Sequence, residues 1–158
     1  MNTALLCEQL AQRLQARGWM MATAESCTGG LIAARCTDLA GSSAWFERGF
    51  VTYSNAAKTD MLGVPEALIA QHGAVSEPVA RAMAQGAVQH AHAQVSVAVT
   101  GIAGPSGGSA EKPVGTVWFA WCMGDQIDSS CQRFAGDRAA VREATVQHAL
   151  QGVLDRLT

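Results

Sequence analysis

The sequence predicts an α/β fold, a single-domain three-layer α/β/α sandwich with a mixed, mostly parallel sheet. Short apolar segments alternate along the chain with longer segments of helical periodicity, which is typical of layered α/β proteins. Late in the chain, two strand-like segments flank Gly124-Asp125, a hairpin turn pair that adds antiparallel pairing to the sheet. The 158 residues show no repeat, linker or low-complexity tract, so residues 1–158 are expected to form one domain.

In the first half of the chain, apolar residues at helical spacing indicate helices and short apolar runs indicate strands. Leu6, Leu10 and Leu14 are four residues apart and predict a first helix that ends near Gly18. The elements expected after it are a buried strand over residues 19–24, a helix over 31–39, a strand over about 49–53, and short helices over 55–62 and 65–71.

The second half of the chain continues the alternation. Ser76 is a candidate N-cap for a longer helix whose pattern fades near His92. Three strands rich in β-branched or aromatic residues are then expected over residues 95–100, 115–123 and 127–134. Asp137 caps a final helix, whose apolar positions are Val146, Leu150, Val153 and Leu157.

Composition excludes several classes of protein. With 49% hydrophobic and 15% charged residues, the chain is too apolar for disorder, and its apolar runs are too short for a membrane span. The net charge of −2 argues against nucleic-acid binding, which relies on neutralising phosphates. The N-terminal segment is amphipathic and does not have the continuous apolar core of a signal peptide. The chain has five cysteines, an odd number, and no CxxC pair. Together these features predict a cytoplasmic protein with free thiols.

Two glycine-rich loops follow apolar strands, and ligands of open α/β sheets bind at the carboxyl ends of strands. In the first loop, residues 25–30, Ser26 and Thr28 place hydroxyl groups at a helix N-terminus, which favours anions and developing oxyanions. The pattern is not the G-x-S-x-G of a nucleophile elbow, and simple helix capping by these hydroxyls is the alternative.

The second loop, residues 101–108, has four glycines but matches neither the P-loop nor the dinucleotide-binding pattern. Thr100 and Ser106 can donate hydrogen bonds to a ligand there, and a flexible surface loop is the alternative. Arg138 and Arg142, at the start of the final helix, can bind a phosphate or remain solvated helix residues.

A serine nucleophile needs a base near neutral pH. None of the four histidines lies in a glycine-rich loop, and His90 and His92 are two residues apart, so they cannot share a helix face around a metal. Lys58, one of two lysines, follows a strand end, and burial can lower the pKa of a lysine enough for it to act as a base. A surface charge is the alternative for Lys58. Cys27 is the rival nucleophile, or else a small buried residue.

Five blocks of this sequence, in the same order, resemble the CinA C-terminal domain family over about residues 5–157. They are Thr23–Gly30, Gly49–Asn55 with Lys58, His72–Ser76, Thr100–Gly108 with Lys112–Val117, and Gly136–Arg138 with Arg142. The resemblance implies a CinA C-terminal-like amidase domain over residues 1–158. Members of this length act as nicotinamide-nucleotide amidases, which hydrolyse nicotinamide mononucleotide to nicotinic acid mononucleotide and ammonia, a step of NAD recycling.

The resemblance carries the family's catalytic serine, tyrosine and lysine onto Ser26, Tyr53 and Lys58. In the mechanism expected from them, Ser26 attacks the carboxamide carbon and neutral Lys58 takes the hydroxyl proton, directly or through Tyr53. Backbone N–H groups of residues 27–30 hold the oxyanion, and no metal or cofactor is needed. The residues expected to bind the substrate are Thr28, Gly29, Gly30, Thr100, Gly101, Ser106, Arg138 and Arg142.

Two other functions stay open at this stage. One is a catalytically silent nucleotide-binding module linked to competence or the DNA-damage response. The other is a cysteine amidase that uses Cys27. The expected partner is the small-molecule substrate, with no nucleic acid and no membrane. An Ala- and Val-rich surface allows a homo-oligomer, with a dimer favoured.

Overall fold

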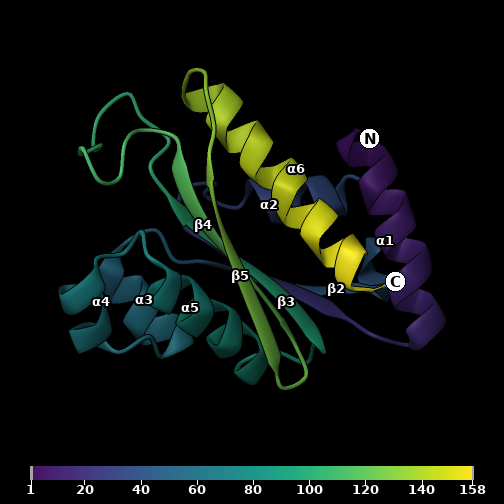
Figure 1. Ribbon diagram of the computed structural model, residues 1–158. Coiled ribbons are helices and arrows are strands. Elements are labelled where there is room, and N and C mark those ends of the chain that lie inside the picture. The colour runs from purple at the N-terminus through teal and green to yellow at the C-terminus, as the bar shows by residue number, and fades with distance from the viewer. Residues whose placement is uncertain (1, 158) are drawn as a thin grey trace.

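The structure is a computed structural model that describes residues 2–157 (Figure 1). Within that range the helices are α1 (Thr3–Arg17), α2 (Leu31–Thr37), α3 (Asn55–Leu62), α4 (Glu66–His72), α5 (Glu77–Gln89) and α6 (Arg138–Arg156), with a 3-10 turn at Ser42–Ala44. The strands are β1 (Met21–Glu25), β2 (Phe46–Val51), β3 (Val95–Gly101), β4 (Thr116–Met123) and β5 (Gln126–Arg133).

The strands form one mixed sheet in the order β2-β1-β3-β4-β5. β1 pairs in parallel with both β2 and β3, whereas the β3–β4 and β4–β5 pairs are antiparallel. Four of the five strands therefore point the same way, and β4 alone runs against them. The predicted α/β class with a mixed, mostly parallel sheet is confirmed.

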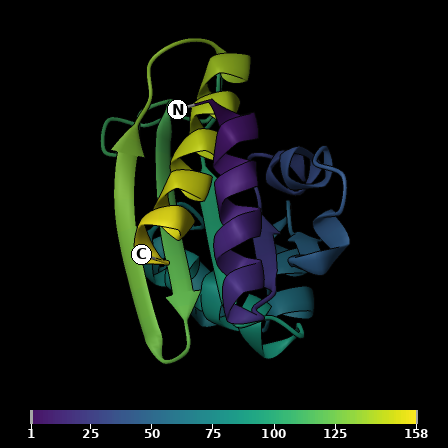
Figure 2. The same ribbon diagram turned by 90° about the vertical axis from the view of Figure 1, so that its right-hand side faces the viewer.

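Helices cover both faces of this sheet and complete the three layers. α1, α2 and α6 lie on one face, with α1 and α6 side by side, and α3, α4 and α5 lie on the other (Figures 1 and 2). All five residues of β1 are buried because this central strand has helices above and below it. A pattern of alternating burial is therefore absent from β1, whose Thr23 and Glu25 are buried together with its apolar residues.

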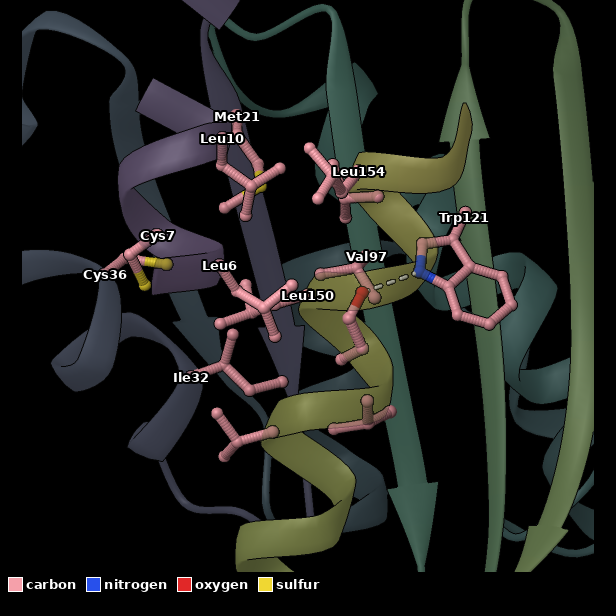
Figure 3. Close-up of a cluster of buried hydrophobic side chains, with 14 of the residues drawn as sticks. Leu6, Cys7, Leu10, Met21, Ile32, Cys36, Val97, Trp121, Leu150 and Leu154 are labelled. Atoms are coloured by element: carbon pink, nitrogen blue, oxygen red, sulfur yellow. Dashed lines mark hydrogen bonds between the residues drawn. The ribbon is translucent and has the colours of Figure 1, made fainter. Parts of the chain in front are cut away.

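Two hydrophobic clusters hold the layers together. The cluster under α1, α2 and α6 includes Leu6, Leu10, Ile32 and Leu150, which meet over the sheet (Figure 3). In the same view the indole N–H of Trp121 donates to the Ala149 carbonyl at 3.0 Å, which ties β4 to α6. The second cluster lies under α3, α4 and α5 and contains Leu62, Val64, Val79 and Met83. No helix in the described range has the length and apolar character needed to cross a membrane.

Capping residues place most helix ends where the sequence predicts them. α1 ends before Gly18, which adopts a left-handed φ of 66°. The Ser54 hydroxyl accepts from the Ala57 N–H at the start of α3, and Asp137 accepts from the Ala140 N–H at the start of α6. Ser76 occupies the N-cap position of α5, but its hydroxyl donates to the Gly73 carbonyl instead of capping the helix.

The main boundary error concerns β2. The aromatic content of residues 49–53 predicts a strand there, but β2 covers Phe46–Val51 because its register is set by pairing with β1, beginning at Met21. Smaller differences occur at the strand after α1, which is Met21–Glu25, and at the C-terminal ends of α2 and α5, which stop at Thr37 and Gln89. Because β2 ends at Val51, Tyr53 lies beyond the strand, in the connection to α3, and not inside the strand as the sequence predicts.

Candidate active site

The parallel strands bring three connections to one edge of the sheet. Residues 26–30 follow β1, residues 52–54 follow β2, and residues 102–115 follow β3. Because parallel strands end at the same edge, side chains far apart in sequence meet there. The backbone confirms the junction, since the Ser26 N–H donates to the Val99 carbonyl at 3.1 Å and the Thr52 N–H to the Glu25 carbonyl at 2.9 Å.

Glu25 shapes the turn that carries Ser26. Its fully buried carboxylate accepts from the Thr28 hydroxyl at 2.6 Å and from the N–H groups of Ile32 and Ala33 at 2.7 and 3.0 Å. These two N–H groups belong to the first turn of α2, where a negative charge is stabilised by the helix dipole. The anion expected at this helix N-terminus is therefore the protein's own carboxylate, and not a ligand.

Glycine is required in this turn by backbone conformation. Gly29 and Gly30 have φ values of 59° and 104°, which residues with a side chain rarely adopt. The turn leaves the Ser26 side chain only 8% exposed, at the floor of a cavity.

Lys58, a residue of α3, lies next to Ser26. It is only 1% exposed, and its Nζ lies 3.1 Å from Ser26 Oγ. Two backbone carbonyls surround the amine, that of Thr52 at 3.1 Å and that of Tyr53 at 3.2 Å. The alternative interpretation of Lys58 as a solvated surface charge is therefore wrong.

Burial lowers the pKa of Lys58, because the charged form loses its hydration. Among the described residues no carboxylate forms an ion pair with this amine, and the neighbouring Cys27 opposes the effect of burial only in part. A neutral amine has two N–H donors and one lone pair. In the structure Nζ donates to Ser26 Oγ and to the Thr52 and Tyr53 carbonyls, and the Ser26 hydroxyl donates to the Tyr53 carbonyl at 3.4 Å. When the amine is neutral, its lone pair can take the Ser26 proton once this hydroxyl rotates toward Nζ. This arrangement suits a general base.

A cavity of about 200 Å³ opens above these groups. It is lined by Ser26, Cys27, Tyr53, Asn55, Lys58, Ala74, Val75, Thr100, Gly101, Ala103 and Arg138. The Arg138 guanidinium is held at its edge by donating to the Gly104 carbonyl at 2.9 Å and to the Tyr53 phenol oxygen at 3.4 Å. The structure thus brings together six of the residues expected from the sequence: Ser26, Tyr53, Lys58, Thr100, Gly101 and Arg138.

The other expected residues do not line this cavity. Thr28 turns its hydroxyl toward Glu25, and its carbonyl accepts from Arg142 at 2.9 Å, so both residues brace the turn. Gly29 and Gly30 shape the same turn. Ser106 is exposed in the loop after β3, away from the lining. Thr100 also has a structural contact, because its hydroxyl donates to the Ala74 carbonyl at 2.9 Å.

The side chain of Tyr53 is not placed between Ser26 and Lys58. It is 62% exposed, and its phenol contacts Arg138, while its backbone carbonyl faces the amine. Since Nζ and Oγ are already in hydrogen-bond contact, a proton can pass between them without a relay.

Cys27 does not have the properties of a nucleophile. Burial raises the pKa of its thiol to about 11, so the reactive thiolate is scarce near neutral pH. No histidine lines the cavity, and His90 places Nδ1 2.7 Å from the Gly86 carbonyl instead. In residues 2–157, no group of three or more His, Cys, Asp and Glu side chains is arranged to hold a metal ion.

Sequence reasoning did not single out several residues of the site. Asn55, Ala74, Val75 and Ala103 line the cavity, and nothing in their types indicates this role. Glu25 was recognisable in principle, because a carboxylate between a strand and the start of a helix is favourably placed for the helix dipole.

Comparison with known proteins identifies the family of this chain. Residues 3–157 match the CinA C-terminal domain family. The chain is 60% identical to the nicotinamide-nucleotide amidohydrolase PncC of Escherichia coli (strain K12), over 92% of this chain and 89% of that protein. It is 54% identical to the protein of the same name from Pseudomonas putida, over 94% and 93%.

A solved structure has the same fold. The competence/damage inducible protein CihA from Agrobacterium tumefaciens superimposes with a TM-score of 0.96 at 46% sequence identity, covering 98% of this chain and 95% of that one. The match of sequence over nearly the whole described range, together with this structural likeness, shows that the chain belongs to the CinA C-terminal domain family.

Proposed function

We propose that this protein is a nicotinamide-nucleotide amidohydrolase, which hydrolyses the carboxamide of nicotinamide mononucleotide to nicotinic acid mononucleotide and ammonia. The observation that carries the proposal is the 3.1 Å contact between Ser26 Oγ and the buried Lys58 amine at the floor of the cavity. It supplies a nucleophile and a base in contact, as amide hydrolysis by a serine requires. The names of the E. coli and P. putida relatives supply the substrate class.

In the first step, Lys58 removes the Ser26 proton as Oγ attacks the carboxamide carbon. The tetrahedral intermediate collapses when the ammonium of Lys58 returns that proton to the departing nitrogen. Ammonia leaves, and an ester joins Ser26 to the nicotinoyl group. A water molecule, deprotonated by the same amine, then hydrolyses the ester and regenerates the serine.

The turn after Ser26 provides the oxyanion donors in this proposal. The Gly29 N–H donates to the Ser26 carbonyl, the Leu31 N–H to the Thr28 carbonyl, and the N–H groups of Ile32 and Ala33 to Glu25. The Cys27 N–H lies against its own thiol, and neither it nor the Thr28 N–H donates to a backbone carbonyl in the described chain. They directly follow the nucleophile, so they are the donors that we assign to the developing negative charge.

Tyr53 has two proposed roles. Its carbonyl fixes the Lys58 amine, and its exposed ring forms one side of the cavity mouth, where the pyridine ring enters. Its phenol serves to hold Arg138 rather than to carry the Ser26 proton.

Arg138 is our candidate for the phosphate of the nucleotide, because its guanidinium lines the cavity whereas Arg142 braces the turn. Replacing Arg138 by Ala should raise KM for nicotinamide mononucleotide by about 10- to 100-fold, the value of one charge-assisted contact. Nicotinamide riboside, which lacks the phosphate, is the control substrate. Steady-state kinetics with both substrates test the assignment, and an equal loss for the riboside would contradict it.

Ammonia release from nicotinamide mononucleotide, with the product identified by mass, tests the activity itself. Wild type should turn over, and Ser26→Ala should lose about 10³-fold or more. The reaction is run with and without EDTA, and we expect the same rate in both. Folding of each variant is checked by circular dichroism. A folded wild type with no turnover would exclude the amidase.

That last outcome would favour the second candidate, a catalytically silent nucleotide-binding module linked to competence or the DNA-damage response. The observation that supports this second candidate is that the A. tumefaciens protein is named a competence/damage inducible protein. A cytoplasmic location, the lack of nucleic-acid and membrane partners, and a dimer stay predictions.

A further inference from the structure

We propose that Cys7 and Cys36 form a modification site, a thiol pair that a peroxide converts to an intramolecular disulfide joining α1 to α2. The pair lies outside the cavity that contains Ser26, and its formation does not depend on the proposed amidase activity.

The geometry brings the two thiols together from separate helices. Cys7 lies in the second turn of α1 and Cys36 near the end of α2. Their sulfur atoms lie next to each other at the margin of the hydrophobic cluster (Figure 3), and the two thiols share a hydrogen bond. Cys36 donates to the Cys7 sulfur, and the Cys7 thiol donates to the Arg35 carbonyl oxygen at 3.6 Å.

A small oxidant has a route to this pair. A cavity of about 150 Å³ is lined by Thr3, Ala4, Cys7, Glu8, Arg35, Asp38 and Leu39. Both cysteines are buried, with Cys7 1% and Cys36 0% exposed. A site of this size admits molecules comparable to water, such as hydrogen peroxide, and hinders bulky thiol reagents.

The two thiols differ in pKa, so that one of them is the better nucleophile, as the proposed reaction requires. Their hydrogen bond lowers the pKa of Cys7 and raises that of Cys36, so Cys7 is the better nucleophile. The Cys7 thiol attacks peroxide, breaks the O–O bond and becomes a sulfenic acid, with release of one water. The Cys36 sulfur then displaces the sulfenic oxygen as a second water. Two thiols and one peroxide thus give one disulfide and two waters.

The other three cysteines lack this arrangement. Cys27 and Cys122 are buried elsewhere, and burial raises the pKa of both thiols. Cys131 is exposed on the edge strand β5. In the described structure none of these three has a second thiol in contact.

Peptide mapping of the folded protein after hydrogen peroxide treatment tests the proposal. The variant Cys131→Ser is used as background, because it removes the exposed thiol that can cross-link two molecules. Trypsin places Cys7 in residues 1–13, Cys27 in residues 18–35 and Cys36 in residues 36–48, so each linkage has its own mass. We expect the peptide that joins 1–13 to 36–48, two daltons lighter than the sum and lost after dithiothreitol.

Two variants distinguish a reactive pair from general oxidation. In Cys36→Ala no partner thiol remains for Cys7, so the linked peptide should be absent and residues 1–13 should be recovered without a cross-link to any other cysteine. Cys122→Ala, a matched loss of another buried thiol, should leave the cross-link unchanged. The wild-type map decides even if a variant fails to fold. In the wild-type protein, a Cys7–Cys36 pair that stays reduced while Cys131 is oxidised would overturn the proposal.

A link to turnover rests on the proposed function and is tested separately. Forming an S–S bond of about 2.0 Å joins the last turn of α2 covalently to α1 and restricts its movement. The first turn of α2 holds Glu25, which shapes the Ser26 turn. We expect slower ammonia release from the oxidised protein, restored by dithiothreitol. An unchanged rate with a mapped disulfide would overturn this link alone.

Discussion

Lys58 has the surroundings that our proposed base requires, although lysine is most often a solvated surface charge. The amine is buried, has no carboxylate partner within the described chain, and faces two carbonyls and one hydroxyl. Desolvation lowers its pKa, and the carbonyls orient the neutral form toward Ser26. Burying a lysine amine at this position costs free energy, most of all in its charged form, and the rest of the fold must supply the stability that offsets this cost.

Replacing Lys58 by Met removes the base and retains most of the side-chain volume. We expect kcat to fall by about 10²- to 10⁴-fold, the usual contribution of general acid–base catalysis. Lys112→Met, at the only other lysine, is the matched control and should retain nearly full activity. Retained activity in folded Lys58→Met would show that another group is the base.

The pH dependence follows from the direction of the pKa shift. Only the neutral amine accepts the Ser26 proton, so kcat/KM should rise with pH through the pKa of free-enzyme Lys58. That midpoint should lie below 10.5, the usual value for lysine. The free energy of unfolding should also rise with pH between the folded and unfolded pKa values, because the unfolded chain binds the extra proton. A pH–rate profile that rises only above 10.5 would contradict the assignment.

At the scale of elements, the Ser26 turn and α2 act as one unit because Glu25 connects them. The carboxylate accepts three hydrogen bonds, one from the turn and two from the helix N-terminus. α2 has only seven residues and could not persist alone, so its position depends on this carboxylate and on packing against α1 and α6.

Glu25→Gln tests this unit. Glutamine keeps the shape but places an NH₂ group against N–H donors, so one or more buried donors lose an acceptor. We expect about 1–3 kcal/mol lower free energy of unfolding, together with a lower kcat from a displaced Ser26. Glu143→Gln is the matched control, because its ion pair with Arg35 is half exposed and contributes about 0–1 kcal/mol. Urea denaturation of both variants makes the comparison, and equal losses would argue against the connecting role.

At the scale of the whole molecule, a close contact holds α6, the helix that begins at Arg138, against the sheet. Gly152 lies in α6 against the indole of Trp121, whose N–H donates to the Ala149 carbonyl. A Cβ at Gly152 would overlap the indole ring. This tight contact, far from the cavity, holds α6 against β4, and Arg138 lies at the start of the same helix.

Gly152→Ala sets two effects against each other. Alanine favours the helix by about 1 kcal/mol, whereas overpacking a tight core contact costs about 1–3 kcal/mol. We expect a net loss of stability and a shift in tryptophan fluorescence, measured by thermal denaturation and emission spectra. A variant more stable than wild type would show that α6 can move away from the indole without cost.

The fold could be predicted largely from local patterns. The spacing of Leu6, Leu10 and Leu14, the cap at Asp137, and the Gly124-Asp125 hairpin are short-range features, and each is found in the structure. The start of β2 was missed because strand register depends on the partner strand β1, which lies more than twenty residues away.

The site divides in the same way. The sequence by itself determined which chemical groups are available: a serine on a strand-to-helix turn, two lysines, and arginines at the start of the last helix. Only the tertiary structure decided that Lys58 is buried against Ser26, that Arg138 rather than Arg142 lines the cavity, and that Tyr53 faces outward. The physical reason is that burial and contact between distant segments set both pKa and orientation, and these arise only when β1, β2 and β3 end at one edge of the sheet.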